Sequence, residues 1–158
     1  VGKHLGVRLT QKHRREWVKV VADYAPKALS TLEKYEADKD KRIQKVMDRV
    51  RRQARGRCQI TNRRQSVHKF DLEVHHLFDK RSSPQFADME LNLIAIASDT
   101  HAHFHQWMGG TKVPCTLEDM ENYIAEFSNS LFPGGNAEQA TKVAIHLSKA
   151  KSVLRSYR

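Results

Sequence analysis

Apolar and polar residues alternate along residues 70–76, with an apolar side chain at every second position up to Val74. This period of two predicts a half-buried β-strand that ends in the adjacent histidines His75 and His76. Successive side chains of a strand point to opposite faces, so the two histidines are expected to face different ways. The short apolar run at residues 91–97 predicts a second strand packed beside the first.

A short helix is predicted immediately after the second strand. Asp99 is a favourable N-cap, and the helix is expected to cover residues 100–107 and to stop at the Gly-Gly pair that follows. Residues four apart share a helix face, so His101 and His105 can reach one ion, whereas His103 points away from both. The centre of the chain is therefore expected to form a strand, a loop, a second strand and a short helix.

Helical spacing of apolar residues dominates on both sides of this centre. Upstream, it predicts a helical hairpin with a first helix at residues 11–24, closed by Pro26, and a second from a capping box at residues 30–33 to Gly56. Downstream, it predicts a capped helix from Thr116, a loop at residues 132–135 and a last helix capped by residues 136–139, with its apolar stripe packed.

The predicted fold is therefore α+β and mostly α-helical. A basic helical region at residues 1–56 precedes a strand–strand–helix core at residues 57–110, and a further helical region covers residues 111–158. No internal repeat, low-complexity tract or clear flexible linker is evident. The three regions are expected to form one compact domain.

Positive charge is concentrated upstream of the histidines. The formal net charge is +10, and residues 1–57 hold 17 Lys and Arg against 7 Asp and Glu, while residues 58–158 hold 11 of each. Asp48 is the only acidic residue from position 41 to position 57. Such a stretch favours a polyanion as partner, with binding that weakens steeply with salt. The alternative is a solvated helix face.

At the histidines the sequence resembles the HNH endonuclease family, also called the ββα-metal or His-Me finger family. Its pattern is a histidine pair ending a strand, a central Asn, and a histidine nine residues later on a helix; here these are His75, His76, Asn92 and His101. The segments RCQIT at residues 57–61, LEVHHL at residues 72–77 and NLI at residues 92–94 are also similar to the family. The resemblance covers roughly residues 57 to 108, about one third of the chain.

The resemblance implies a ββα-metal core in which His75 and His101 hold a divalent metal, His76 is the general base, and Asn92 orients the loop or the base. His105 is similar to the third ligand in the three-histidine metal site of the DNase-type colicins. The implied activity is hydrolysis of double-stranded DNA to 5′-phosphate and 3′-hydroxyl ends. Beside this motif, DNA contacts are expected from the basic stretch and from the loop after the histidine pair: Lys45, Arg49, Arg51, Arg52, Arg55, Arg57, Lys80 and Arg81.

The chemistry of phosphodiester hydrolysis fits these roles. A metal ion stabilises the negative charge that grows in the transition state, and a neutral histidine can take the proton of the attacking water. Only Glu73, Asp79 and Asp99 are near carboxylates, which favours one ion over a paired-metal site. Availability favours Mg²⁺ or Mn²⁺ as that ion, whereas an imidazole set favours a transition metal such as Zn²⁺ or Ni²⁺ by affinity.

Two other functions fit the same residues. A non-catalytic DNA-binding module would hold a structural zinc and leave DNA uncut, and a ribonuclease would use the same scaffold on RNA. At single positions, His105 could instead bind a phosphate or pack near Trp107, and Asn92 could simply stabilise a turn. Four histidines have no partner at ligand spacing, and a solvated or packing role is expected for each: His4, His13, His68 and His146.

The two cysteines, Cys58 and Cys115, exclude the four-cysteine zinc site that some family members add. They also make no disulfide scaffold, so buried thiols and a reducing, cytoplasmic setting are expected. No apolar run approaches the roughly 20 residues needed to span a bilayer, and the first residues contain no hydrophobic signal core, so no membrane partner is expected. Nothing in the sequence sets an oligomeric state.

Overall fold

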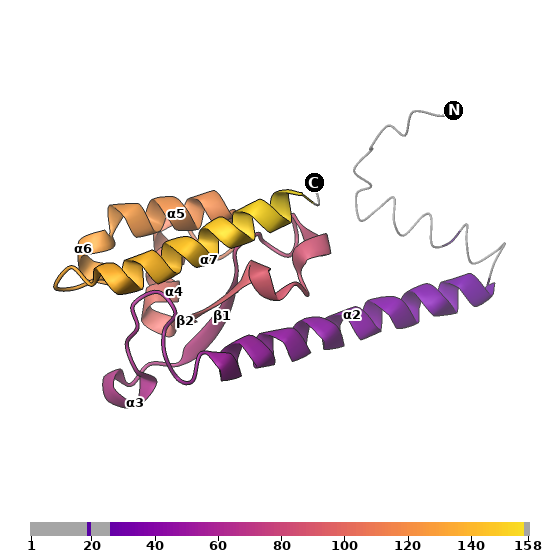
Figure 1. Cartoon of the computed structure of the whole chain (residues 1–158). Helices are drawn as coiled ribbons and strands as arrows, with labels where there is room; N and C mark the ends of the chain where they lie inside the picture. The colour runs from indigo at the N-terminus through magenta and orange to yellow at the C-terminus, as the bar shows by residue number, and fades with distance from the viewer. Residues whose placement is uncertain (1–18, 20–25, 157–158) are drawn as a thin grey trace. The chain divides into compact units, whose positions relative to one another are not determined.

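The computed structural model describes Lys19 and residues 26–156. By internal contacts the chain divides into two units, Val1–Lys41 and Arg42–Arg158. The helix α2 (Pro26–Gln53) begins in the first unit and continues past the boundary (Figure 1). Apart from Lys19, which is helical, the predicted helix at residues 11–24 lies outside the described residues, and so does the predicted hairpin.

Helix α2 begins earlier than the sequence pattern predicts. Its first residue is Pro26, so the capping box predicted at residues 30–33 is wrong. Proline suits the first helical turn because its φ is already helical and no intrahelical N–H bond is lost there. The helix ends at Gln53, close to the predicted stop, and Arg55 and Gly56 then adopt positive φ values of 50° and 68°.

The second unit is a mostly helical α+β structure with one two-stranded antiparallel sheet. After α2 its elements are α3 (Gln65–His68), β1 (Leu72–His76), the 3₁₀ turns η1 (Pro84–Phe86) and η2 (Glu90–Asn92), β2 (Leu93–Ala97), α4 (Ser98–Trp107), α5 (Leu117–Glu126), α6 (Ser128–Leu131) and α7 (Ala137–Arg155).

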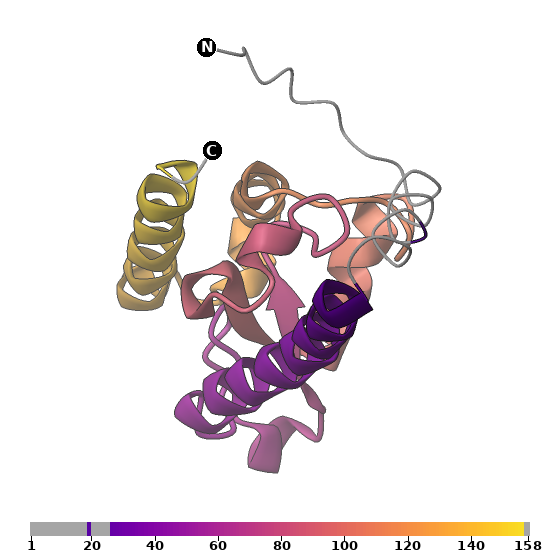
Figure 2. The same cartoon turned by 90° about the vertical axis from the view of Figure 1, so that its right-hand side faces the viewer.

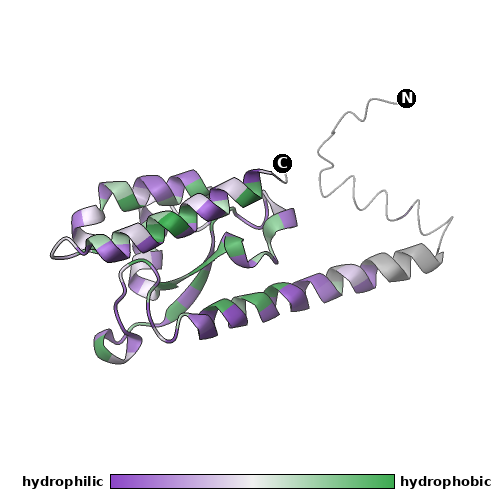
Figure 3. Cartoon of the chain, viewed as in Figure 1, coloured by the Kyte–Doolittle hydropathy of each residue, from purple (hydrophilic) through white to green (hydrophobic). Residues whose placement is uncertain are grey.

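The two predicted strands pair with each other, as expected, although each begins two residues later than predicted. In their register His75 lies opposite Ile94, and His76 lies opposite Leu93. All five residues of β2 are buried, which fits their apolar character in Figure 3. Helix α4 packs against both strands, so the end of β1 faces the helix that follows β2 (Figure 2).

Strand β2 passes directly into α4, and this changes the predicted cap. Ala97 occupies the N-cap position, so the prediction that Asp99 caps the helix is wrong. Asp99 lies in the first turn instead, where its Oδ2 accepts a hydrogen bond of 2.8 Å from Nη1 of Arg63. A negative charge in the first turn also suits the helix dipole. The pairing with Arg63 holds the pKa of Asp99 below its usual range.

The C-terminal helices agree with the predicted caps. Thr116 and Asp119 form the capping box of α5, and the side chain of Asn136 accepts a hydrogen bond from the Gln139 backbone N–H at the start of α7. Residues 132–135 form the predicted connection. Helices α5 and α7 pack against each other (Figure 1), and the stripe of α7 contributes buried residues to the core: Val143, Leu147, Ala150 and Leu154.

Candidate metal centre

His75 and His76 face different sides of β1, as the strand period predicts. His75 is only 5% exposed and points toward α4, where its Nδ1 lies 3.0 Å from Nε2 of His101. His76 is half-buried, and its Nε2 lies 3.0 Å from the carbonyl oxygen of Ala87. The adjacent histidines therefore enter two different environments.

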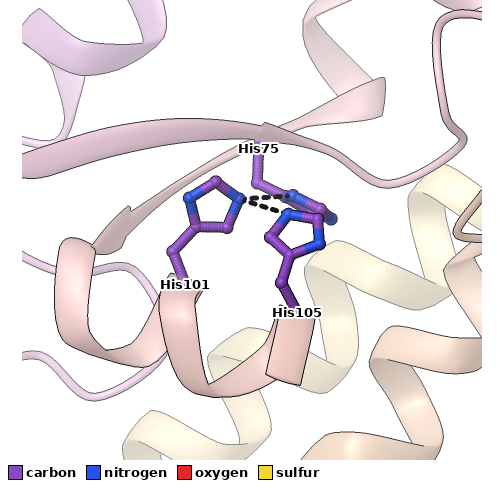
Figure 4. Close-up of side chains that lie close together, drawn as sticks. All are labelled: His75, His101 and His105. Atoms are coloured by element: carbon purple, nitrogen blue, oxygen red, sulfur yellow. Dashed lines mark hydrogen bonds between the residues drawn. The ribbon is translucent and has the colours of Figure 1, made fainter. Parts of the chain in front are cut away.

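Helix α4 brings His101 and His105 onto one face, with their Nε2 atoms 2.9 Å apart. Figure 4 shows the three rings of His75, His101 and His105 gathered between the strand and the helix. One nitrogen from each ring lies within 4.8 Å of the other two. His103 points away from this cluster and its Nδ1 lies 2.8 Å from the Tyr123 hydroxyl, so its predicted exclusion agrees with the geometry.

The spacing of the three nitrogens suits a metal ion. An ion held tetrahedrally about 2.0–2.1 Å from imidazole nitrogens separates its ligands by roughly 3.3–3.4 Å. The separations from His101 to its two neighbours are 3.0 Å and 2.9 Å, slightly shorter than this value, and the nitrogens of His75 and His105 lie within 4.8 Å of each other. Burial lowers the pKa of His75 to about 3 and lowers the pKa of His105, which favours the neutral rings that bind metals.

Two further residues orient the rings. The Nδ1 of His101 is hydrogen-bonded to the carboxylate of Glu73, and the Nε2 of His75 lies 3.6 Å from Sγ of Cys115. With protons on these outer nitrogens, the inner nitrogens of His75 and His101 present lone pairs to each other. Two facing lone pairs repel unless a cation lies between them. The hydrogen bonds outside the cluster therefore favour an ion inside it.

Sequence reasoning did not assign these two roles. The sequence identifies Glu73 only as a nearby carboxylate, although it lies two positions before His75 and therefore on the same strand face. That spacing was the available signal. Cys115 is 40 residues from His75 and gives no local signal. Burial raises the pKa of its thiol to about 11, so it remains protonated and donates to the carbonyl oxygen of His76.

His76 borders the same space as the three-histidine cluster. An open pocket of about 180 Å³ is lined by the three histidines of the cluster and by His76. Asp79 and Lys80 also line this pocket. Because Nε2 of His76 donates to the carbonyl of Ala87, the neutral ring keeps its lone pair on Nδ1. Burial lowers the pKa of His76, so the ring is mainly neutral at pH 7.

Asn92 is fully buried and organises the loop between the two strands. Its Oδ1 accepts a 2.8 Å hydrogen bond from the Phe78 backbone N–H. Its Nδ2 donates to the carbonyl oxygens of Phe78 and Phe86, each at 3.1 Å. Phe86 immediately precedes Ala87, whose carbonyl holds His76. These hydrogen bonds fit the expectation that Asn92 orients the loop. The bond to Phe86 lies one residue from the Ala87 carbonyl that orients His76.

The basic residues predicted to contact DNA divide into two groups. Arg49 lies 3.6 Å from Glu90, and Arg51 contacts both Asp48 and the carbonyl oxygen of Leu72, so these two side chains, although exposed, have partners within the protein. The others include exposed side chains at positions 45, 52, 55, 80 and 81, and Arg57, which is half-buried. Val50 of α2 and Ala54, the residue just after its end, are buried, which agrees with the predicted packing face.

The remaining candidates take structural positions or lie outside the description. Cys58 and Cys115 are both buried free thiols, as expected. His68 is exposed and His146 half-buried, while His4 and His13 lie outside the described residues. Among the described residues, no helix has the length and apolar character needed to cross a membrane. Comparison with protein-family models, curated proteins and solved structures finds no match to this chain.

Proposed function

We propose that the protein is a metal-dependent endonuclease of the HNH type that hydrolyses phosphodiester bonds of DNA with one divalent ion. The observation that carries this proposal is the meeting of two kinds of histidine at one pocket. His75, His101 and His105 converge through one nitrogen each, and His76 borders the same pocket with a lone pair on Nδ1. Metal-assisted hydrolysis of a phosphodiester uses a metal ion next to a general base that takes the proton of the attacking water.

Each residue has a distinct role in this proposal. His75, His101 and His105 hold the ion, with Glu73 and Cys115 fixing the orientation of the first two rings. When bound, the ion supplies positive charge that stabilises the phosphate oxygens in the transition state. Three protein ligands leave coordination positions open for water and substrate, which distinguishes a catalytic from a closed structural site.

His76 acts as the general base. Its Nδ1 takes a proton from the attacking water, while its Nε2–H stays bound to the Ala87 carbonyl. A base held in this way keeps one tautomer and one ring orientation, so no reorganisation is needed when the water arrives. Asn92 is a positioning residue in this scheme, because it binds the backbone one residue away from that carbonyl.

The strands β1 and β2 and helix α4 form the ββα-metal core of this proposal. The substrate is a polyanion, and Lys80 places a positive charge at the pocket that holds the histidines. Double-stranded DNA follows from the family resemblance and from the charge excess upstream of the pocket. Mg²⁺ or Mn²⁺ would meet the usual demands of nuclease chemistry, whereas three imidazoles bind Zn²⁺ or Ni²⁺ more tightly.

Nicking of supercoiled plasmid tests the proposal. The wild-type chain is incubated with Mg²⁺, Mn²⁺, Zn²⁺, Ni²⁺ or a chelator, beside the variants His76→Ala and His68→Ala. We expect cleavage with at least one ion, none with the chelator, strong loss in His76→Ala and full activity in His68→Ala, which alters an exposed histidine outside the pocket. An intact plasmid with every ion contradicts the proposal. Tight metal and DNA binding without cleavage would indicate a structural zinc module, and preference for an RNA competitor would indicate a ribonuclease.

A further inference from the structure

Three arginines converge on an open groove outside the metal centre. The groove has a volume of about 610 Å³ and is lined by Arg55, Gly56, Arg57, Arg64, Gln65 and Ser66, with no acidic residue in its lining. An antiparallel backbone bridge joins Arg57 and Arg64, and the Gln65 N–H donates to the Gly56 carbonyl at 2.8 Å. We call this feature the arginine groove.

The charge of the arginine groove is not neutralised by the protein itself. Across residues 26–156, the arginines found in ion pairs are Arg42, Arg49, Arg51, Arg63 and Arg155, and none of them lines the groove. Within the groove, Nη1 of Arg57 contacts only neutral oxygens of Asn62, the carbonyl at 3.4 Å and Oδ1 at 3.3 Å. These contacts restrain the guanidinium and leave its charge available. Like charges gathered without counter-charges repel one another and oppose folding.

The backbone around the groove is also unfavourable. In the described part of the chain, the non-glycine residues with positive φ are Arg55, Asn62 and Lys69, with φ of 50°, 58° and 50°, and all three belong to this one segment. Asn tolerates this conformation, but Arg and Lys are seldom found in it. A glycine at position 55 would relieve the strain. A positive φ and an arginine without an ion pair therefore coincide at Arg55.

We propose that the arginine groove binds consecutive phosphates of a DNA backbone and so positions the duplex for the metal centre. This inference rests on the proposed nuclease function and adds the surface on which its substrate docks. Guanidinium groups match phosphate geometry through paired hydrogen bonds, and such contacts set register without reading sequence. Arg64, which the charge pattern does not single out, joins Arg55 and Arg57, whereas Arg49 and Arg51 already have acidic partners within the protein.

The distance to the metal centre is compatible with one bound duplex. Arg64 and His75 are 11 residues apart in the sequence. Even a fully extended chain of that length spans at most roughly 36–40 Å, about one helical turn of duplex DNA. The groove and the histidines are therefore separated by no more than the length of a short duplex. Backbone contacts of this kind predict docking without sequence preference.

Binding of a labelled duplex of about 20 base pairs, followed by fluorescence anisotropy in chelator, tests the groove separately from catalysis. The variants are Arg64→Gln and Arg55→Gly, with Arg155→Gln as a control that removes the same charge from the ion pair with Glu118. Loss of one charged hydrogen-bonding group should weaken binding about tenfold. Each lost phosphate contact should also reduce the slope of log affinity against log salt by about 0.9.

Arg55→Gly gives a signature that a misfolded variant cannot imitate. It should weaken DNA binding while the midpoint temperature of unfolding holds or rises by about 2–4 °C, because glycine accepts the positive φ without strain. Affinities equal to wild type in both groove variants would overturn the proposal, and so would an equal loss in Arg155→Gln. Competition by poly-glutamate as effective as by unlabelled duplex would also overturn it, in favour of an acidic protein partner.

The outcomes separate this inference from the nuclease proposal. Groove-dependent DNA binding in a protein that cuts no DNA with any ion would keep the groove and refute the nuclease. Metal-dependent cleavage combined with binding that ignores Arg55 and Arg64 would keep the nuclease and refute the groove.

Discussion

Replacing Glu73 by Gln should weaken binding of a divalent metal about tenfold. The carboxylate of Glu73 accepts a hydrogen bond from Nδ1 of His101, and this bond holds the Nε2 lone pair toward the cluster. Gln keeps the shape and one acceptor but removes the charge that makes His101 a stronger electron donor. The substitution therefore tests orientation and charge without opening a cavity.

The expected magnitude follows from the exposure of the carboxylate. A hydrogen bond to a charged group contributes about 1.5–3 kcal/mol when it is well formed. The Glu73 side chain is 47% exposed, so solvent screens its charge and the lower end of that range applies. A loss of about 1.4 kcal/mol corresponds to a tenfold weaker dissociation constant. The same figure lies within the roughly 10- to 100-fold effect of removing an outer partner from a metal-bound histidine.

Isothermal titration of the metal-free protein with Ni²⁺ or Zn²⁺ measures this change. Glu138→Gln is the matched control, because Glu138 carries the same charge on α7 and pairs only with Lys142 among the described residues. The control should bind as the wild type does, and His101→Ala should lose most of its affinity. If Glu73→Gln binds within twofold of wild type while His101→Ala does not, the carboxylate has no part in organising the metal centre, and our account of the ring orientation is refuted.

Three other predictions concern the surroundings of the centre. Asn92→Ala leaves three backbone groups without their partner inside the core. Denaturant unfolding should therefore show that the free energy of unfolding falls by about 3–5 kcal/mol. A fall of less than about 1 kcal/mol would contradict the hydrogen-bond network around Asn92. Cys115→Val removes the sulfur beside Nε2 of His75 but keeps an apolar side chain, and it should weaken metal binding severalfold. Cys115→Ser should bind the metal with an affinity closer to that of wild type. Equal metal affinities in wild type and both variants would exclude a role for the sulfur. Burial raises the pKa of Tyr123 to about 12 from an ordinary value near 10, so the folded state keeps a proton that the unfolded state loses. That contribution to stability is complete below pH 10 and is lost as pH rises toward 12. Over this interval, urea titrations should show that Tyr123→Phe loses less stability than wild type. Parallel curves of stability against pH for the two proteins would refute the assignment.

Local periodicity was sufficient to predict the elements that carry the histidines. The alternation before His75 and the apolar run of β2 predicted two neighbouring strands, and the four-residue spacing of His101 and His105 predicted a shared helix face. These features depend on side-chain direction within one element, which sequence spacing determines. For the same reason His103 could be excluded from the cluster, and its contact with Tyr123 agrees with that exclusion.

Contacts between distant segments could not be predicted in this way. Cys115 reaches His75 only because the chain folds back from the end of α4 toward β1, and no local pattern encodes that return. Asp99 looked like a cap because Asp is common at that position, but an uninterrupted passage from β2 into α4 left Ala97 there. The charge run likewise gave no sign that Arg49 pairs with Glu90 or that Arg51 donates to the carbonyl oxygen of Leu72. The contacts of Cys115 and Arg49 depend on partners far away in the sequence, whereas the cap of α4 depends on where β2 ends.

The most direct test of the central claim is a single-turnover cleavage assay on a short duplex, with metal affinity measured on the same preparations of wild type and His76→Ala. In the proposed mechanism three histidines hold the ion and His76 takes the proton. We therefore expect His76→Ala to bind the metal within about twofold of wild type but to cleave roughly 100- to 10,000-fold more slowly. Cleavage by His76→Ala at the wild-type rate, or a wild-type protein that holds the metal and leaves the duplex intact, would contradict it.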